Sequence, residues 1–369
     1  MRLLFTVQGE GRGHLTQALA VYRSLSRQGH ELVGVVVGSP GHRPLPDFFT
    51  SALPVEVRSL PSPGFVVRSH RSLSLSATLG RALLGLGSTR DSVRTLRQLC
   101  HDLRPDLIVN FFEPLTGLAQ LFAPLPAPVV SIAHQFMFEH PGYRWPKGLG
   151  ANKLGLKWFV GLVGYGSWKL ALSLAPDEDL EAQRLVVAPP LLREMLFEQV
   201  PRDDGYYLVY LLNHGYADDI REWQSRHPDV SLQCFYDRPG APEEERVAPG
   251  LTFHRLDGEK FLRLMAGCRA VVCTAGFESV SEALWLGKPL FLVPVEHHVE
   301  QALNAVEAER LGLGIADRSF ALDRLTELPA EVQSEPFRRW VATAEACLDR
   351  VIGLALAEHR LREGASAAA

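Results

Sequence analysis

The chain has 369 residues, of which 46% are hydrophobic and 22% are charged, and its formal net charge is −4 at pH 7. This length predicts two domains that each bury a core, and the composition excludes a disordered or fibrous protein. The 5 cysteines are scattered and show no paired metal-ligand spacing. We therefore expect an ordered cytoplasmic protein without disulfides, a resident metal or another cofactor.

The charge is distributed unevenly along the chain. Residues 1–175 hold 18 Lys and Arg against 9 Asp and Glu, a net charge of +9, whereas residues 176–369 hold 20 against 33, a net charge of −13, and the two sum to −4. This asymmetry indicates that the first half faces an anionic partner. We expect a substrate or a membrane surface and no nucleic acid.

The first half alternates short apolar runs with segments of helical length. This alternation predicts strands joined by helices, in a parallel sheet covered on both faces. Because Arg2 leads directly into an apolar strand, we expect no signal peptide ahead of the fold. The predicted strands are 3–7, 32–37, 55–60, 107–110 and 129–132.

A glycine-rich segment, 8–18, follows the first predicted strand and opens a helix. One interpretation is a dinucleotide fingerprint, but the glycine spacing differs from it, and the second strand ends in 37–39 without an acidic residue for a ribose. We instead expect a turn in which Gly11 and Gly13 let the backbone approach a ligand. His14 begins the helix and should face an interdomain cleft.

Further polar residues follow the strands of the first half. Glu113 is the rival to His14 as a general base, because the neighbouring Asn110 carries an amide that cannot accept a proton. We expect Asn110, His134 and Gln135 to donate or accept hydrogen bonds on the acceptor side. The serine- and arginine-rich segment 68–94 is a candidate acceptor loop.

The stretch Lys147–Ala175 is apolar and contains tryptophans and lysines. Its length suggests a membrane span, but the charges of Lys157 and Lys169 within it argue against one. Two interpretations stay open: a pair of core helices, which we favour, and an interfacial stretch that contacts anionic lipid at the membrane periphery.

The pattern of strands and helices restarts in the second half, with strands predicted at 206–212, 232–235, 251–254, 270–273 and 290–293. We expect a first domain at 1–188, a second at 203–334, and a final helix at 335–363, since prolines interrupt the pattern near 187–202. Apolar residues at helical spacing predict the final helix.

Residues 273–304 carry the most informative motif. Thr274, Ala275 and Gly276 form a small-residue turn between a strand and a helix, where free N–H groups can bind a diphosphate. Glu282 follows about 9 Å along that helix, where a carboxylate can accept both hydroxyls of a ribose. A loop with His297 and Gln301 comes after the next strand. The alternative is a plain βαβ unit in which Glu282 is a solvated helix residue.

This segment resembles the donor-binding motif of GT-B glycosyltransferases, the group that contains UDP-glucuronosyltransferases and the lipid-II N-acetylglucosaminyltransferase. The resemblance implies that the turn binds the diphosphate, Glu282 the ribose and Gln301 the hydroxyls of the sugar. It also implies that His14 is the general base, as in the glucuronosyltransferase branch, or else contacts a ligand without proton transfer. The implied fold is two facing Rossmann-like domains with a C-terminal helix that crosses back to the first.

The same resemblance implies an inverting transfer from a UDP-sugar to a hydroxyl acceptor, which a lipid could carry. Asn213 should contact the donor, and Phe253 and Leu256 should line the pocket for its base. Since no Asp-x-Asp pair stands in a metal-binding setting, a helix dipole and turn amides should serve the diphosphate without a metal. The rivals are a non-hydrolysing UDP-N-acetylglucosamine 2-epimerase, disfavoured by the few acids of the first half, and a non-catalytic nucleotide-sugar-binding protein.

Overall fold

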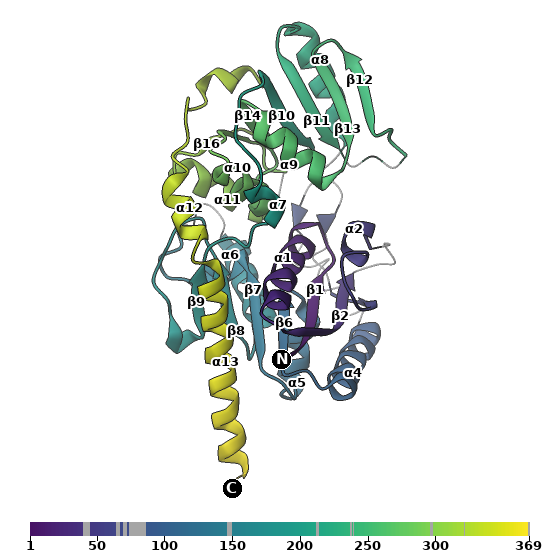
Figure 1. The fold of residues 1–369 in the computed structure, drawn as a ribbon, viewed down its shortest axis with the longest axis vertical. Helices are drawn as coiled ribbons and strands as arrows, with labels where there is room; N and C mark the ends of the chain where they lie inside the picture. Colours follow the sequence, from purple (N-terminus) through teal and green to yellow (C-terminus); the bar gives the residue numbers. More distant parts are fainter. Residues whose placement is uncertain are drawn as a thin grey trace. The chain divides into compact units, whose positions relative to one another are not determined.

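The computed structural model describes residues 1–369 except 40–44, 64–66, 69–71, 74–85, 146–149, 212–213, 237, 239, 296–297, 321 and 368–369. The chain forms two compact units (Figure 1). The first unit contains Met1–Arg193 and Trp340–Ala369, and the second contains Glu194–Arg339. Each unit is built on a seven-stranded sheet flanked by helices.

The first sheet is entirely parallel, in the order β3-β2-β1-β6-β7-β8-β9. All the strands predicted for the first half are present, whereas β8 and β9 were not predicted. A separate antiparallel pair joins β4 (Val67–Arg68) to β5 (Ser72–Leu73). The strands of the sheet are β1 Arg2–Gln8, β2 Glu31–Ser39, β3 Val57–Pro61, β6 Leu107–Phe111, β7 Val129–Ala133, β8 Trp168–Leu172 and β9 Leu185–Ala188.

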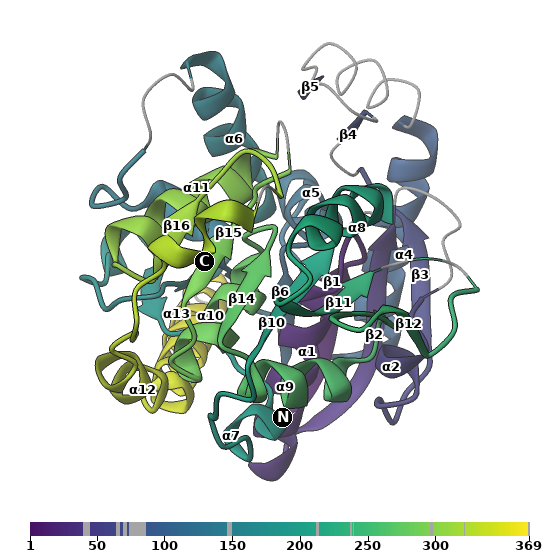
Figure 2. The same ribbon diagram turned by 90° about the horizontal axis from the view of Figure 1, so that it is seen from above.

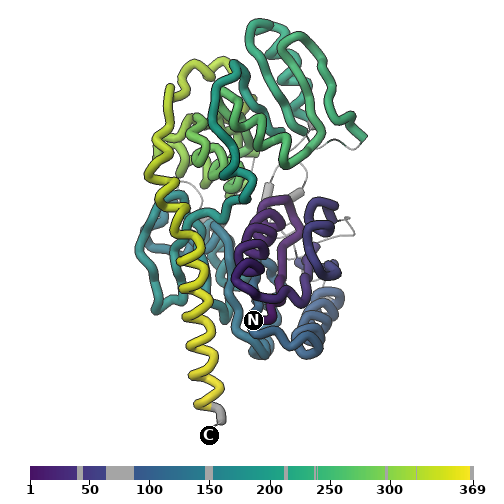
Figure 3. Tube along the Cα trace, in the orientation of Figure 1, coloured from purple at the N-terminus to yellow at the C-terminus, as the bar shows by residue number. Residues whose placement is uncertain are grey.

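The helices of the first unit pack their apolar faces onto this sheet. Leu96 of α4 and Leu115 of α5 share a core cluster with Leu4 and Ile108 of the sheet. The long helix α13 runs beside β8 and β9 (Figure 3). The helices are α1 Gly13–Arg27, α2 Asp47–Thr50, α4 Leu86–Leu103, α5 Pro114–Phe122, η1 His134–Glu139, α6 Gly150–Val163, η2 Glu181–Gln183 and α13 Ala344–Ala367.

The favoured interpretation of Lys147–Ala175 as two core helices is wrong for its second part. Only α6 is helical, and Trp168–Leu172 is the buried strand β8. A short apolar run in a covered sheet has no alternation that distinguishes it from a buried helix segment, which explains the error. In the described part of the chain, no helix is long and apolar enough to cross a membrane.

The second sheet has the order β12-β13-β11-β10-β14-β15-β16, and only β12 runs antiparallel, against β13 (Figure 2). The strands predicted for the second half are present, and β12 and β16 are additional. The strands are β10 Tyr206–Leu211, β11 Ser231–Tyr236, β12 Glu244–Ala248, β13 Leu251–Arg255, β14 Ala270–Cys273, β15 Leu290–Leu292 and β16 Gly314–Ala316.

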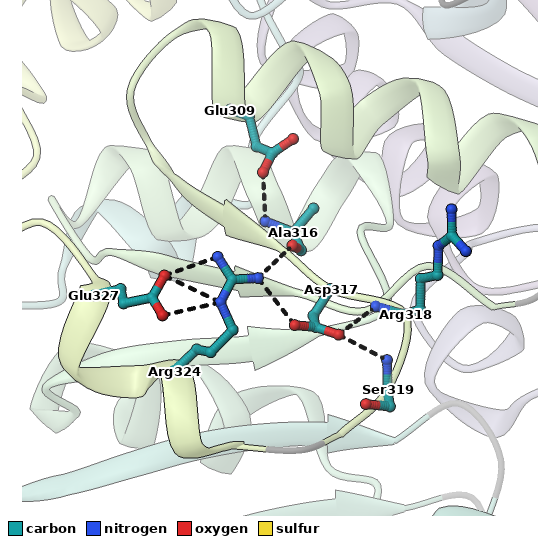
Figure 4. A network of polar contacts seen from close by, with 7 residues as sticks. All are labelled: Glu309, Ala316, Asp317, Arg318, Ser319, Arg324 and Glu327. Carbon is teal, nitrogen blue, oxygen red and sulfur yellow. Dashed lines mark hydrogen bonds and ion pairs between the residues drawn. The ribbon is translucent and has the colours of Figure 1, made fainter.

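One face of the second sheet is covered by α8 and η4, whose Trp223 and Leu325 share a core with Phe291. Arg324 ties η4 to the end of β16, because its guanidinium donates to Glu327 and to Asp317 (Nη1–Oδ2, 2.9 Å; Figure 4). The helices are α7 Glu194–Phe197, η3 His214–Tyr216, α8 Ala217–Arg226, α9 Gly258–Gly267, α10 Phe277–Trp285, α11 Val299–Arg310, η4 Leu322–Glu327 and α12 Glu335–Val341.

The strand order of both sheets fixes where a ligand should bind. In the first sheet the chain winds outward in both directions from β1 and β6, and in the second from β10 and β14. Open α/β sheets bind ligands beyond the carboxyl ends of the strands at such a switch point. The glycine loop and Glu113 lie at the first switch point, and the turn 274–276 lies at the second.

Candidate active site

The glycine loop after β1 owes two of its glycines to backbone geometry. The N–H of Gly9 donates to the carbonyl of Gly38 at 2.7 Å, and a Cβ on Gly9 would lie 2.8 Å from that oxygen. Gly11 has a φ of +81°, which L side chains rarely adopt. The helix α1 then begins at Gly13 without a side-chain cap from Arg12, so its first N–H groups point into the loop without a helical partner.

His14 lies in the first turn of α1 and is half-buried. Its Nδ1 is 3.3 Å from Oε1 of Gln17, and its ring stacks on Phe112 with centroids 5.5 Å apart and planes inclined by 23°. When Gln17 accepts this hydrogen bond, Nδ1 carries the proton and the lone pair of the neutral imidazole is on Nε2. This is the tautomer that a general base with an oriented ring requires.

Phe112 adopts a left-handed backbone conformation with a φ of +57°, which costs a non-glycine residue free energy. Asn110 stabilises this turn, because its Oδ1 accepts from the N–H of Glu113 at 2.8 Å and from Oγ1 of Thr6 at 3.0 Å. Its Nδ2 donates to Oγ of Ser131 at 3.1 Å, and the side chain is fully buried. Asn110 therefore positions the turn and has no face left for an acceptor.

Glu113 is fully buried at the N-terminus of α5. Its Oε1 accepts from the N–H of Leu115 at 3.0 Å and from Oγ of Ser62 at 2.5 Å. Burial raises the pKa of the carboxyl to about 7, although the hydrogen bonds from Ser62 and Leu115 lower it. Oε2 has no partner among the described residues and packs onto Gly38, where a Cβ would lie 1.9 Å away. This enclosure makes Glu113 a poorer candidate than His14 for contact with an acceptor hydroxyl.

His134 and Gln135 follow β7 at the start of η1, and both are buried. Nδ1 of His134 is 2.7 Å from the carbonyl oxygen of Leu172. Oε1 of Gln135 has no hydrogen-bond partner among the described residues. Their contact with an acceptor stays a prediction, and it is stronger for Gln135 because a buried acceptor atom without a partner is costly.

In the second unit, the turn after β14 is held in an unusual conformation. Ala275 is fully buried with a φ of +58°, and its carbonyl accepts from Nδ2 of Asn304 in α11 at 3.0 Å. Gly276 then caps α10 without a side chain, and a Cβ on it would meet nothing within 4 Å. As in any helix, the first N–H groups of α10 have no intrahelical acceptor, and such groups can bind an anion. Sequence reasoning missed this role of Asn304, since the distant pairing leaves no local pattern.

Glu282 lies two turns into α10 and is only 2% exposed. Gln301 is also buried, and its Oε1 accepts from the N–H of Val295 at 2.8 Å. Its own N–H donates to Nδ1 of His298 at 3.3 Å, so that His298 caps α11. These two hydrogen bonds hold Gln301 between the loop after β15 and the start of α11. Its contact with the hydroxyls of the donor sugar stays a prediction. The predicted donor contacts Asn213 and His297 lie outside the described residues.

The pocket expected for the base at Phe253 and Leu256 stays a prediction. Phe253 is fully buried, with its ring 5.0 Å from that of Tyr236 and the Arg221 guanidinium 4.9 Å from its centroid. Its side chain therefore packs in the core of the second unit. Leu256, half-buried just after β13, stays a candidate.

No group of three or more His, Cys, Asp or Glu side chains that could hold a metal ion occurs within the described ranges. The polar residues that the two switch points do bring together are His14 and Gln17 in the first unit, and the turn 274–276 with Asn304 in the second. An imidazole at the start of α1 and a glycine-capped helix N-terminus at α10 are groups that can serve proton transfer and anion binding, respectively.

Two Rossmann-like units of this topology, followed by a helix that belongs to the first unit, have the GT-B fold. Residues 1–330 match glycosyl transferase family 1, and the chain belongs to that family. An uncharacterized glycosyltransferase of Methanosarcina mazei is 25% identical over 341 residues, which cover 85% of each chain. The protein is thus an enzyme that transfers glycosyl groups, which sets aside the epimerase and the non-catalytic alternatives.

Solved structures show the same fold. A UDP-glucosyltransferase from Polygonum tinctorium, in a complex with 3,4-dichloroaniline, matches with a TM-score of 0.61 and 14% identity over 96% of this chain and 98% of its own. The glycosyltransferase SsfS6 of Streptomyces sp. SF2575, in a complex with thymidine diphosphate, matches with a TM-score of 0.55 and 16% identity over 96% and 99%.

Proposed function

We propose that this glycosyltransferase moves a sugar from UDP to a hydroxyl acceptor, with inversion at the anomeric carbon. The observation that carries the proposal is the turn at the second switch point, where Asn304 holds the left-handed Ala275 and Gly276 caps the start of α10 without a side chain. Backbone N–H groups at a helix N-terminus bind phosphate oxygens through hydrogen bonds and the helix dipole. The same groups would stabilise the charge that develops on the leaving diphosphate.

Glu282 decides between a ribonucleotide and a deoxyribonucleotide donor. A carboxylate accepts two hydrogen bonds from a ribose diol, whereas the sugar of thymidine diphosphate offers one hydroxyl fewer. The burial of Glu282 strengthens such bonds because little water competes for the carboxylate. We therefore favour UDP, although the nucleotide in the complex of a structural relative is thymidine diphosphate.

On the acceptor side, His14 is the base in this proposal. Its Nε2 would take the proton of the acceptor hydroxyl while the hydroxyl oxygen attacks the anomeric carbon, and UDP would leave from the opposite face. Support comes from the contact with Gln17, which favours a proton on Nδ1 when Oε1 accepts it, and from the stack on Phe112, which orients the plane of the ring. Gln135, with its unpartnered Oε1, is the acceptor-side residue best placed to accept a hydrogen bond. We propose that the reaction takes place in the cytoplasm.

The test has two stages. Calorimetry with UDP and dTDP should show tighter binding of UDP, and the preference should disappear in Glu282→Ala, where the lost charged hydrogen bond costs about 1.5–3 kcal/mol. Turnover of a UDP-sugar panel with hydroxyl acceptors, followed by NMR of the product anomer, then tests transfer and inversion. Equal UDP affinity in Glu282→Ala and the parent would contradict the donor site.

A further inference from the structure

The helix α6 exposes two large apolar side chains on one side. Leu154 is 74% exposed and Trp158 is 69% exposed. Residues four apart lie on the same face of a helix, so the two side chains form one surface. We call this pair, with the basic residues around it, the α6 face. In an isolated globular unit, such a surface is a candidate for an interaction.

The chain segment that carries the α6 face has formal side-chain charges of a single sign. From His140 to Pro176 the sequence has no Asp or Glu. The ammonium groups of Lys153 and Lys157 lie 4.9 and 5.8 Å from the ring centroid of Trp145. Lys169 does not belong to this surface, because it pairs with Glu139 and only 12% of its side chain is exposed. Lysines and tryptophans beside exposed apolar groups are typical of segments that lie in the interface of an anionic bilayer.

The opposite side of α6 packs toward His14, the proposed general base. The ring of Phe159 is 5.9 Å from that of Phe112, which in turn stacks on His14 at 5.5 Å. Gly117 of α5 fixes the position of α6, because a Cβ there would lie 1.9 Å from the carbonyl oxygen of Leu162. One rigid helix therefore carries the α6 face on one side and supports the stack beneath His14 on the other (α6 in Figure 2).

We propose that the α6 face docks on an anionic lipid bilayer and that the acceptor is a hydroxyl-bearing amphiphile held in that bilayer. Leu154 and Trp158 would enter the interface, and Lys153 and Lys157 would lie among the anionic headgroups. The docking itself depends only on the α6 face, whereas the identity of the acceptor rests on the proposed function of His14. Charge complementarity favours a bilayer over a second copy of the chain, whose α6 face would bring the same positive charge.

The experiment is flotation of the full chain with vesicles of phosphatidylcholine alone and with equimolar phosphatidylcholine and phosphatidylglycerol. We expect binding to the anionic vesicles only, with an affinity that falls as salt is added. Leu154→Ser with Trp158→Ser, and separately Lys153→Gln with Lys157→Gln, should each lower the partition coefficient roughly tenfold or more. Matched controls are Leu361→Ser, 75% exposed on α13, and Arg339→Gln on α12, which should change it less than about twofold.

Three outcomes would overturn the docking proposal: no flotation of the parent at low salt, unchanged flotation of both double variants, or a shift from dimer to monomer in the double variants by light scattering. UDP calorimetry on the same samples separates this proposal from the donor site. Flotation without UDP binding would leave the docking intact and contradict the proposed function. UDP binding without flotation would contradict the docking proposal and leave the proposed function intact. If the protein both floats with vesicles and binds UDP, the transfer rates decide the nature of the acceptor. Transfer to an acceptor in detergent-free solution that is as fast as transfer in vesicles would contradict the assignment of the acceptor as an amphiphile.

Discussion

His14 stacks on Phe112, a residue whose own backbone is held in a left-handed conformation by Asn110. The imidazole therefore rests on a ring that occupies a strained position, in a turn after β6 that the sequence alone marks only as a run of polar and aromatic residues. Backbone strain maintained at Phe112 fits a requirement for one orientation of the His14 imidazole, which we propose as the general base.

The stack can be removed with little change in buried volume. Phe112→Leu should lower the free energy of unfolding by about 1–2 kcal/mol, because leucine fills most of the space. The transfer rate should fall about tenfold or more at unchanged UDP affinity, since the imidazole loses its support. Phe136→Leu is the control, because Phe136 touches Phe112 at 5.7 Å without stacking on His14. Equal loss of rate in both variants would mean that packing, and not the stack, matters.

Glu113 should make the stability of the protein depend on pH. Its folded pKa of about 7 lies above the ordinary value of 4.5, so the folded protein binds more protons than the unfolded chain between these values. The stabilisation is complete below pH 4.5 and is lost as the pH rises through 7, by up to roughly 3 kcal/mol. Glu113→Gln keeps an oxygen for Leu115 but cannot ionise. Urea unfolding should find this variant more stable than the parent at pH 8 and similar at pH 5, and the opposite order would disprove the buried-acid assignment.

Asn304 should matter to nucleotide binding from a distance. Asn304→Ala removes the hydrogen bond to the carbonyl of Ala275 and should cost about 1–3 kcal/mol of stability. Because the left-handed turn then relaxes, UDP affinity should also weaken by about tenfold, equivalent to 1.4 kcal/mol. Glu300→Ala, in the first turn of the same helix, should leave UDP affinity unchanged. If calorimetry finds the parent UDP affinity in Asn304→Ala, this turn does not contribute to binding of the donor nucleotide.

Gln301 distinguishes sugar contact from loop closure. If its amide binds the donor sugar, Gln301→Ala weakens binding of the UDP-sugar and leaves the affinity for UDP unchanged. We expect this result together with a stability loss of about 1 kcal/mol, because the bond to the N–H of Val295 is also lost. Parallel titrations with UDP and the UDP-sugar decide the point. Equal weakening for both ligands would assign Gln301 to the loop alone.

The sequence predicts most of this fold because the inner strands are continuous apolar runs between helices of regular length. It predicts the edge strands β12 and β16 poorly, since β12 contains exposed residues such as Glu244 and Arg246 and therefore has no apolar run. The prediction missed strand β8 for another reason, because its residues are as apolar as those of the helix before it.

The candidate site is predicted unevenly for a related physical reason. Gly9, Gly11 and the turn at 274–276 have local signatures, because backbone conformation and close approach demand small residues there. The roles of Asn110 and Asn304 depend on partners far away in the chain, such as Thr6 and Ala275, and no spacing reveals them. The burial of Phe253 in the core was not predicted, because an aromatic residue at a strand end is compatible with a ligand contact and with core packing.

The central claim is that His14 is the base, and the most direct measurement is turnover and UDP-sugar affinity on the same His14→Ala protein. If His14 is the base, transfer should fall by about 10²–10⁴-fold, the usual contribution of a positioned general base. The affinity for the UDP-sugar should stay at the parent value. Glu113→Gln, measured beside it, should retain most of the transfer activity. An active His14→Ala with an inactive Glu113→Gln would contradict the assignment and move the base to the end of β6.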